Sequence, residues 1–301
     1  MPKKRHGKTV NIDLPAKVNL FLSVCGRRED GFHILESLVG FTEFGDRLSV
    51  LLADDFTVSV EGPFAKDLPV VPEDNLVLVA ASVLKEEAGV DLGAKIKLEK
   101  NIPVSAGIGG GSADAAGTLR ILAELWQLKY DVQRLAQVGR VIGSDIPVCV
   151  YSVPAFIEGA GEKVTPQNPF PACGVVLVNA GDPVSTGSVF SARRGTYSKS
   201  LPWPEINSFE QLVFELGLRR NDLSQTAGEL SPIIYDVLKT ISETRRCAYS
   251  QMSGSGGTCF GLYPNQRSAV EAAHSIAQSN PDWWCVPTKF RGSRPDLRIE
   301  R

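Results

Sequence analysis

The stretch Pro103-Val-Ser-Ala-Gly-Ile-Gly-Gly-Gly-Ser-Ala-Asp114 carries four glycines within five positions. A strand is predicted before it, at 94–98, and a helix with one apolar stripe is predicted after it. Glycine lets a ligand approach the backbone closely, and the first amides of a helix have no partner within that helix. The stretch therefore predicts a phosphate-binding loop at a helix start, where Ser112 adds a hydroxyl for phosphate or Mg²⁺.

Two commoner glycine-rich loops do not fit these residues. A P-loop ends in Gly-Lys-Ser/Thr, and no lysine follows Gly111. A dinucleotide-binding fingerprint that began at Gly107 would need glycine where Ser112 stands, which argues against a Rossmann dehydrogenase. A flexible turn is the plain structural alternative, but a turn needs one or two glycines and not four.

Ahead of the loop, residues 16–24 alternate as a strand with two different faces. One face is apolar: Val18, Leu20, Leu22 and Val24. The other face is half polar: Lys17, Asn19, Phe21 and Ser23. The strand therefore gives Lys17 and Asn19 a common, fixed direction.

The remaining pattern predicts an α+β protein of two domains, residues 1–155 and 156–301. In the first domain, 47–52 and 56–61 are predicted as a strand pair, and Asp74 and Asp131 as caps of helices at 75–88 and 132–142. After about residue 155, proline and glycine become frequent. Strands are predicted there at 174–179, 248–252, 259–263 and 284–290, and helices at 232–243 and 268–278.

Composition excludes several classes of function. The 301 residues carry a formal net charge of -2, whereas a nucleic-acid partner favours a surplus of Lys and Arg. No apolar run is long enough for a membrane span, and no secretory signal follows the N-terminus. The six cysteines lie far apart without a CxxC pair, which predicts reduced thiols in the cytoplasm and no protein metal site.

The glycine loop resembles that of the GHMP kinases, whose pattern is Pro, three residues, Gly-Leu-Gly and a serine-rich end. Six segments in the same order are similar to that family: 15–22, 26–33, 109–116, 143–147, 221–223 and 252–256. The chain departs from the family pattern at Ser105, usually glycine, at Ala113, usually serine, and at Phe32, commonly tyrosine. The resemblance implies an N-terminal domain like ribosomal protein S5 domain 2 and a C-terminal ferredoxin-like α/β sandwich.

The resemblance also implies an activity. It is strongest to the branch of the family that uses ATP and Mg²⁺ to phosphorylate the 2-hydroxyl of a cytidine diphosphate-linked methylerythritol, in the non-mevalonate isoprenoid pathway. The implied ATP-binding residues are Pro103, Ser105, Ala106, Gly107, Ile108, Gly109, Gly110, Gly111 and Ser112, with Asn75 and Lys100 on the adenine side. Alternatively, Asn75 is a helix start and Lys100 a strand-end charge.

For catalysis the resemblance implies Asp145 near the attacking hydroxyl, and Lys17 beside both Asp145 and the γ-phosphate. The residues support this, because Lys17 has a fixed direction on its strand and Asp145 lies in a constrained turn before Pro147. The alternatives without a catalytic role are that Lys17 is a solvated strand residue and that Asp145 only forms the turn.

On the substrate side, the resemblance implies that the rings of Phe32 and Phe190 stack on the two faces of cytosine. It implies that His33 bonds the base edge, that Asn19 contacts the erythritol part and that Thr186 is a weaker contact. Ordinary core packing is the alternative for the two phenylalanines. The second glycine-rich segment, Met252–Gly256, is either a wall of the phosphate cleft or a tight turn between strands.

Two other functions stay open at this stage. One is a GHMP kinase for homoserine or a mevalonate-type alcohol, and the other is a nucleotide-binding regulatory protein without turnover. Retention of both Lys17 and Asp145 argues against the second. In each case the expected partners are small molecules, and the chain is expected to be a monomer or a weak homodimer.

Overall fold

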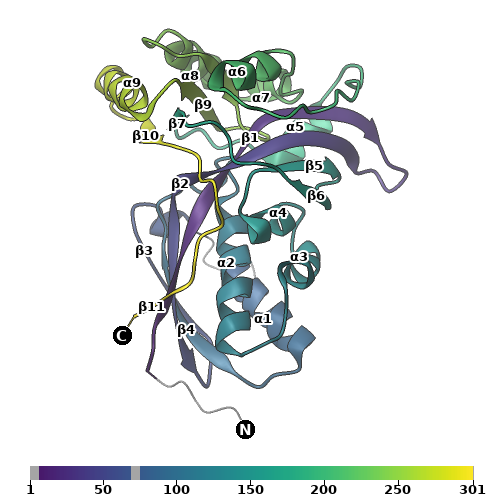
Figure 1. Ribbon diagram of the computed structural model, residues 1–301, viewed down its shortest axis with the longest axis vertical. Coiled ribbons are helices and arrows are strands. Elements are labelled where there is room, and N and C mark those ends of the chain that lie inside the picture. The colour runs from purple at the N-terminus through teal and green to yellow at the C-terminus, as the bar shows by residue number, and fades with distance from the viewer. Residues whose placement is uncertain (1–6, 69–74, 301) are drawn as a thin grey trace.

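The computed structural model describes residues 7–68 and 75–300, which form an α+β fold with two sheets (Figure 1). The larger sheet has the order β11-β1-β2-β4-β3, and β5 pairs with another part of β2 and with β6. Its strands are β1 (Val10–Arg27), β2 (His33–Ala53), β3 (Thr57–Glu61), β4 (Gly93–Glu99), β5 (Ala155–Gly159), β6 (Lys163–Pro166) and β11 (Arg298–Ile299). Its helices are α1 (Leu76–Ala88), α2 (Gly110–Leu125), α3 (Val132–Arg140) and α4 (Ile146–Tyr151), with the short η1 (Ala65–Asp67).

The smaller sheet has the order β10-β7-β9-β8. Its strands are β7 (Gly174–Asn179), β8 (Tyr249–Met252), β9 (Thr258–Tyr263) and β10 (Trp284–Thr288). Between β7 and β8 lie α5 (Thr186–Ala192), α6 (Phe209–Gly217), α7 (Ser224–Leu230) and α8 (Ile233–Ser242), and α9 (Gln266–Ser279) precedes β10. This alternation of strands and helices with antiparallel neighbours is the β-α-β-β-α-β arrangement of a ferredoxin-like sandwich, so that prediction is confirmed.

Strands β1 and β2 form a long hairpin that runs through both halves of the molecule (Figure 1). Leu14 of β1 belongs to the core around α2, whereas Leu22 and Val24 belong to the core of the smaller sheet. Although the predicted boundary lies at residue 155, sheet membership places β5 and β6 with the larger sheet, and the chain end returns to it as β11. The two halves are therefore connected at several points of the chain.

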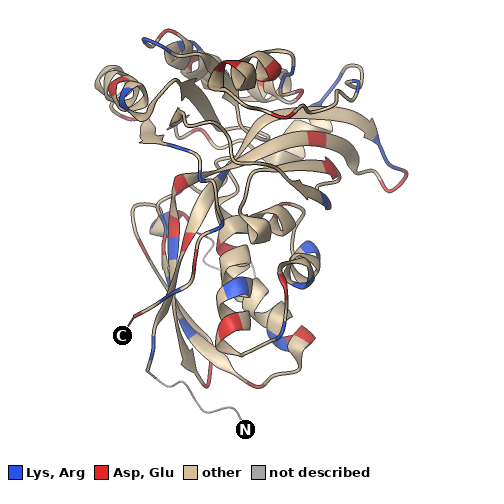
Figure 2. Ribbon diagram, in the orientation of Figure 1, with Lys and Arg blue, Asp and Glu red and all other residues tan. Residues whose placement is uncertain are grey.

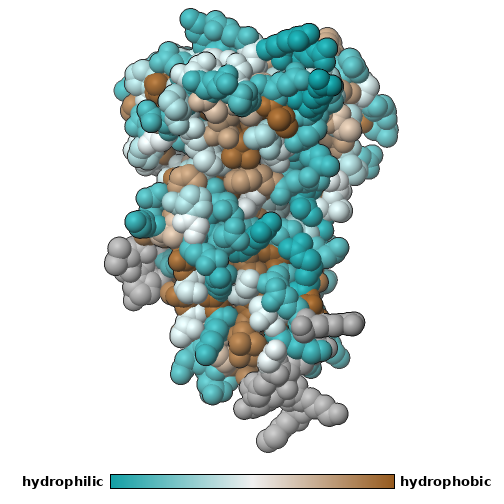
Figure 3. Space-filling view, turned by 90° about the vertical axis from the view of Figure 1, so that its left-hand side faces the viewer, coloured by the Kyte–Doolittle hydropathy of each residue, from teal (hydrophilic) through white to brown (hydrophobic). Residues whose placement is uncertain are grey.

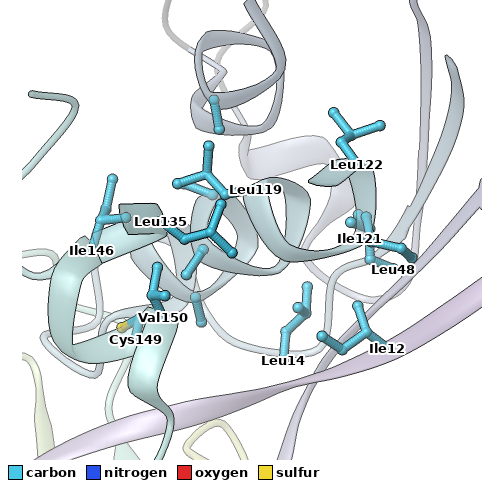
Figure 4. Close-up of a cluster of buried hydrophobic side chains, with 14 of the residues drawn as sticks. Ile12, Leu14, Leu48, Leu119, Ile121, Leu122, Leu135, Ile146, Cys149 and Val150 are labelled. Atoms are coloured by element: carbon cyan, nitrogen blue, oxygen red, sulfur yellow. The ribbon is translucent and has the colours of Figure 1, made fainter. Parts of the chain in front are cut away.

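The core of the lower half in Figure 1 forms where α2 packs between the sheet and its neighbouring helices (Figure 4). Leu119 and Leu122 of α2 are fully buried, as are Leu14 and Leu48 of the sheet. Gly117 permits this approach, because a Cβ there would lie 2.0 Å from Cδ2 of Leu14. Each such leucine contributes about 1.5–3 kcal/mol on burial, so the packing fixes α2 and the loop at its start.

Two predictions about local structure were wrong or could not be followed. Segments 47–52 and 56–61 do not pair with each other, because β4 returns after α1 and lies between β2 and β3. The predicted cap Asp74 lies outside the described residues. In the structure Asn75 is the N-cap of α1 and accepts a bond from the amide of Val77, while Asp131 caps α3 as predicted.

Residues of both charge signs are distributed along the ribbon of both halves of the molecule (Figure 2). The face turned to the viewer in Figure 3 shows apolar side chains in small groups between hydrophilic ones. None of the described helices is both long and apolar enough to cross a membrane. All six cysteines are free thiols, as expected from their spacing.

Candidate active site

The glycine loop turns sharply before α2 begins. Gly107 has φ 73°, Gly109, the N-cap of α2, has φ 66°, and Ser105 has φ 56°. All three lie in the left-handed region, which strains every residue except glycine. Glycine would therefore suit position 105 better. Serine adopts the same left-handed conformation there, so the turn is preserved.

The carbonyls of the loop are held by the protein, while its amides are not. The carbonyl of Ala106 accepts the amide of Thr258 at 3.0 Å, and that of Gly107 accepts the Ser253 hydroxyl at 3.1 Å. The carbonyl of Ile108 accepts the amide of Lys17 at 2.9 Å. The amides of residues 107–112 donate no hydrogen bond to any residue that the structure describes. Together with the α2 dipole, they form an anion site.

The second glycine-rich segment, residues 252–256, packs directly on this loop. A Cβ on Gly107 would lie 2.2 Å from the carbonyl oxygen of Gly256. Asn221 fixes the segment by donating its side-chain amide to the carbonyls of Met252 at 2.9 Å and Gly254 at 2.7 Å. The segment joins β8 to β9, and its Gly254 and Ser255 line the cleft. The segment is a turn between two strands and also lines the cleft, so the two roles considered for it are compatible.

Lys17 and Asp145 meet beside the loop. Their side chains form an ion pair of 2.9 Å, in which Lys17 is buried and the Asp145 side chain is 40% exposed. Lys17 Nζ also donates to Oδ1 of Asn19 at 2.8 Å. Gly109 makes room for the lysine, because a Cβ there would lie 3.1 Å from Lys17 Cε. The arrangement offers an ammonium and an accessible carboxylate next to the anion site.

Asn19 is buried and held on both ends of its side chain. Besides accepting from Lys17, it donates to the hydroxyl of Ser37 at 2.8 Å, and Ser37 donates to the carbonyl of Phe21. The backbone amide of Asn19 donates to Ser253 Oγ at 3.1 Å. These contacts hold the Lys17 ammonium in place, and Asn19 is also among the residues that line the cleft.

Lys100 lies next to the start of α2, and its side chain is buried. Its Nζ contacts Oδ2 of Asp46 at 2.6 Å and Oδ2 of Asp114 at 2.7 Å. Burial opposes its charge, but Asp114 and Asp46 outweigh this effect and raise the pKa of Lys100. Burial raises the pKa of Asp114 to about 7, although the Lys100 ammonium opposes the rise. Lys100 directly follows β4, so it is a strand-end charge, and it is buried and paired with two carboxylates.

A cleft of about 830 Å³ connects these groups. Its walls come from the loop, from the Lys17 strand, from Asn75 and Lys100, and from residues 183–187 and Phe190 of the second half. Ile108 does not line the cleft, because its side chain is fully buried in the core between the sheets. Only its backbone can take part in ligand binding.

The structure brings together only some of the residues predicted to bind the base. The rings of His33 and Phe190 lie 5.1 Å apart at 30°. Phe32 is 61% exposed and lines a separate hollow of about 410 Å³, next to Arg28 and Val141. Among the described residues, no aromatic pair joins Phe32 to Phe190. Thr186 contacts Ser255 at 2.7 Å.

The surroundings of His33 favour the neutral form of its imidazole. Burial, and then the charges of Arg27 and Arg193, lower the pKa of His33 below its usual value. A neutral imidazole offers one donor and one acceptor, which suits the edge of a nucleobase.

Sequence reasoning missed the buried partners of these groups. Asp46, Asp114 and Ser253 were given no role, although Asp114 lies within the decisive stretch. Asp114 gave a signal, because a carboxylate between the apolar positions 113 and 115 of a predicted helix is expected to need a buried partner. Asp46 and Ser253 gave no such signal, because their partners are distant in sequence.

Comparisons with known proteins identify the family of the chain. The family described as GHMP kinases N terminal domain matches residues 75–153, and the family described as GHMP kinases C terminal matches residues 204–282. The chain is 42% identical over 281 residues to the 4-diphosphocytidyl-2-C-methyl-D-erythritol kinase of Paramagnetospirillum magneticum, covering 93% of this chain and 98% of that protein. It is 41% identical to the Chelativorans sp. protein of the same name, covering 94% and 97%.

Solved structures are similar as well. The crystal structure of a 4-(cytidine 5'-diphospho)-2C-methyl-D-erythritol kinase superposes with a TM-score of 0.76 at 31% identity, covering 94% of this chain and all of that one. A homoserine kinase from Cytophaga hutchinsonii superposes with a TM-score of 0.70 at 18% identity, covering 99% of each chain, which shows the shared fold alone. The chain belongs to the GHMP kinase family.

Proposed function

We propose that the chain is an ATP-dependent kinase that phosphorylates the 2-hydroxyl of 4-diphosphocytidyl-2-C-methyl-D-erythritol, a step of the non-mevalonate isoprenoid pathway. The observation that carries the proposal is the 2.9 Å pair of Lys17 and Asp145 beside a loop whose amides are available for phosphate. The high identity to kinases of this name over nearly the whole chain supports the choice of substrate.

The loop binds the triphosphate of ATP through backbone amides. The carbonyls of Ala106 and Gly107 are bonded to the second half, whereas the amides of residues 107–112 have no partner among the described residues and are available to a phosphate in the cleft. Amides fixed before the ligand arrives bind a phosphate without the cost of reorganising the loop. We expect the adenine ring to lie near Asn75 and Leu76, which line the cleft. Lys100 lines it too, but its ammonium is buried between Asp46 and Asp114.

Magnesium fits the site as a companion of the nucleotide. Within residues 7–68 and 75–300, no group of three or more acidic, histidine or cysteine side chains could hold a metal ion by itself. Mg²⁺ commonly keeps several waters and binds through phosphates and one or two protein oxygens. The hydroxyl of Ser112, in the first turn of α2, is such an oxygen. When bound, the ion would neutralise charge on the phosphate oxygens.

Asp145 and Lys17 act where the two substrates meet. The exposed carboxylate of Asp145 orients the 2-hydroxyl and accepts its proton as the oxygen attacks the γ-phosphorus. The Lys17 ammonium stabilises the negative charge that develops on the transferred group. Because Asn19 holds Lys17 in place, the ammonium needs little reorientation during the reaction.

Phe190 of the second half, together with Phe32 and His33 at the start of β2, recognises the cytidyl group. Phe190 offers a ring face, neutral His33 offers a donor and an acceptor, and Phe32 closes over the base when it is bound. Base-aromatic stacking contributes about 1–3 kcal/mol per base. The rings of His33 and Phe190 are in contact in this structure. The base therefore either moves between the two rings or stacks on the free face of Phe190.

The deciding experiment is a phosphorylation assay with MgATP and a panel of alcohols. We expect the cytidine diphosphate-linked methylerythritol to gain one phosphate, identified by mass. Homoserine and mevalonate should give no product above background. Phosphorylation of either of them alone would contradict the proposed substrate, and ATP binding without ADP release from any alcohol would favour a regulatory protein.

A further inference from the structure

Three charged side chains are buried behind the phosphate loop. Lys100, Asp46 and Asp114 are each at most 2% exposed, and the Lys100 ammonium contacts both carboxylates. One oxygen of Asp114, Oδ1, has no hydrogen-bond partner among the described residues. Two carboxylates on one ammonium are costly to bury, because desolvation offsets much of the attraction. Stability alone therefore gives a weak reason for this cluster.

The cluster connects the two ends of the loop through one atom, Nζ of Lys100. Oδ1 of Asp46, on β2, accepts the amides of Asn101 at 2.6 Å and Ile102 at 2.8 Å, which lead into the loop. Asp114 lies in the second turn of α2, just after the loop. Lys100 Nζ bonds both carboxylates, so the spacing between loop entry and loop exit depends on its position.

The ammonium also lies directly against the helix start. A Cβ on Gly110 would lie 3.0 Å from Lys100 Nζ. The ammonium therefore packs closely against the first turn of α2, whose amides belong to the anion site, and glycine at position 110 leaves room for it.

We propose that Asp114 and Asp46 are positioning residues that act through Lys100, fixing the ends of the phosphate loop so that its amides point at the nucleotide phosphates. The proposal rests on the proposed ATP-dependent function. It adds two residues that need not touch either substrate.

The test is Asp114→Asn, which keeps the shape of the side chain and removes its charge. The assay is run at pH 8, above the pKa of about 7, so that the wild-type carboxylate is charged. We expect the ATP Kd, measured by calorimetry, and the KM for ATP to rise about tenfold or more. The KM for the cytidyl substrate should stay within about twofold, because the Phe190 side of the cleft is unchanged.

A matched control is Glu215→Gln, which removes the charge from a pair with buried Arg219 at 2.9 Å in the second half. It should lower the melting temperature and leave the ATP Kd unchanged. If Asp114→Asn does not fold, Asp114→Glu keeps the charge but displaces the carboxylate, and should still weaken ATP binding. Variants of Asp114 that fold and bind ATP like the wild type would overturn the proposal. Failure of the wild type to bind ATP would instead refute the kinase function.

Discussion

The two sides of the cleft are built differently. On the phosphate side, Lys17, Asn19 and Lys100 are almost fully buried and each has at least one fixed partner. On the side proposed to bind the substrate, Phe32 is largely exposed, and the ring of His33 packs on that of Phe190. If the proposed assignments hold, the nucleotide phosphates meet a site that is already formed, whereas binding of the cytidyl group requires Phe32, His33 and Phe190 to rearrange.

The difference has a physical basis in what each side binds. A phosphate needs several amides aimed at one point, and only a loop held by the surrounding protein can provide them without reorganisation. A flat base needs two ring faces and one edge, which exposed side chains can supply by changing rotamer. Substitutions on the two sides should therefore change different kinetic parameters.

The largest effect is expected where the two sides meet. Asp145→Asn should lower kcat about a thousandfold, because the attacking hydroxyl loses its proton acceptor. The ATP Kd should change little, since the loop amides are untouched. Single-turnover kinetics and calorimetry measure the two quantities, with Asp131→Asn, a conservative change at the α3 cap, as control. Near-normal turnover would remove Asp145 from the mechanism.

Gly107→Ala tests whether the phosphate side is as tightly fixed as the contacts indicate. The new Cβ would meet the carbonyl oxygen of Gly256 at 2.2 Å, so the loop must move, and we expect the ATP Kd to rise about a hundredfold. Gly89→Ala is the matched control, because Gly89 also has a positive φ but no atom within 4 Å of its Cβ. It should cost about 1–2 kcal/mol of stability and leave ATP binding unchanged. Similar ATP affinities in both variants would contradict the comparison.

Phe190→Ala tests the substrate side. Loss of one stacking face should raise the KM for the cytidyl substrate about tenfold, and the KM for ATP should stay within about twofold. Phe214→Ala removes an exposed ring from α6 of the same half and should change neither value. Equal effects of Phe190→Ala on both substrates would show that the ring supports the whole cleft instead of binding the base.

The smallest effect is expected at Ser105. Ser105→Gly relieves a left-handed conformation that costs about 1–2 kcal/mol, but glycine adds about 0.5–1 kcal/mol of entropy cost on folding. The free energy of unfolding should therefore rise slightly, by up to about 1 kcal/mol, and denaturant titration can measure it. A lower stability would mean that the serine side chain makes contacts that offset its strain.

Much of the fold and of the phosphate side could be predicted from sequence because the signals are local. Four glycines before an apolar helix predict an anion site, and alternation on β1 places Lys17 and Asn19 on one side. The helices at 233–242 and 266–279 and the strands of the smaller sheet were also predicted near their observed bounds. These features depend on neighbours within a few positions.

Features that join distant parts of the chain were decided only by the tertiary structure. The insertion of β4 between β2 and β3 reverses a pairing that sequence proximity favoured. Asp46 and Lys100 become partners across 54 positions, and Ser253 reaches Gly107 across 146. By itself the sequence determined which residues could bind phosphate. Only folding decided which buried charges and carbonyl contacts hold them in place, because such contacts form only when separate elements pack together.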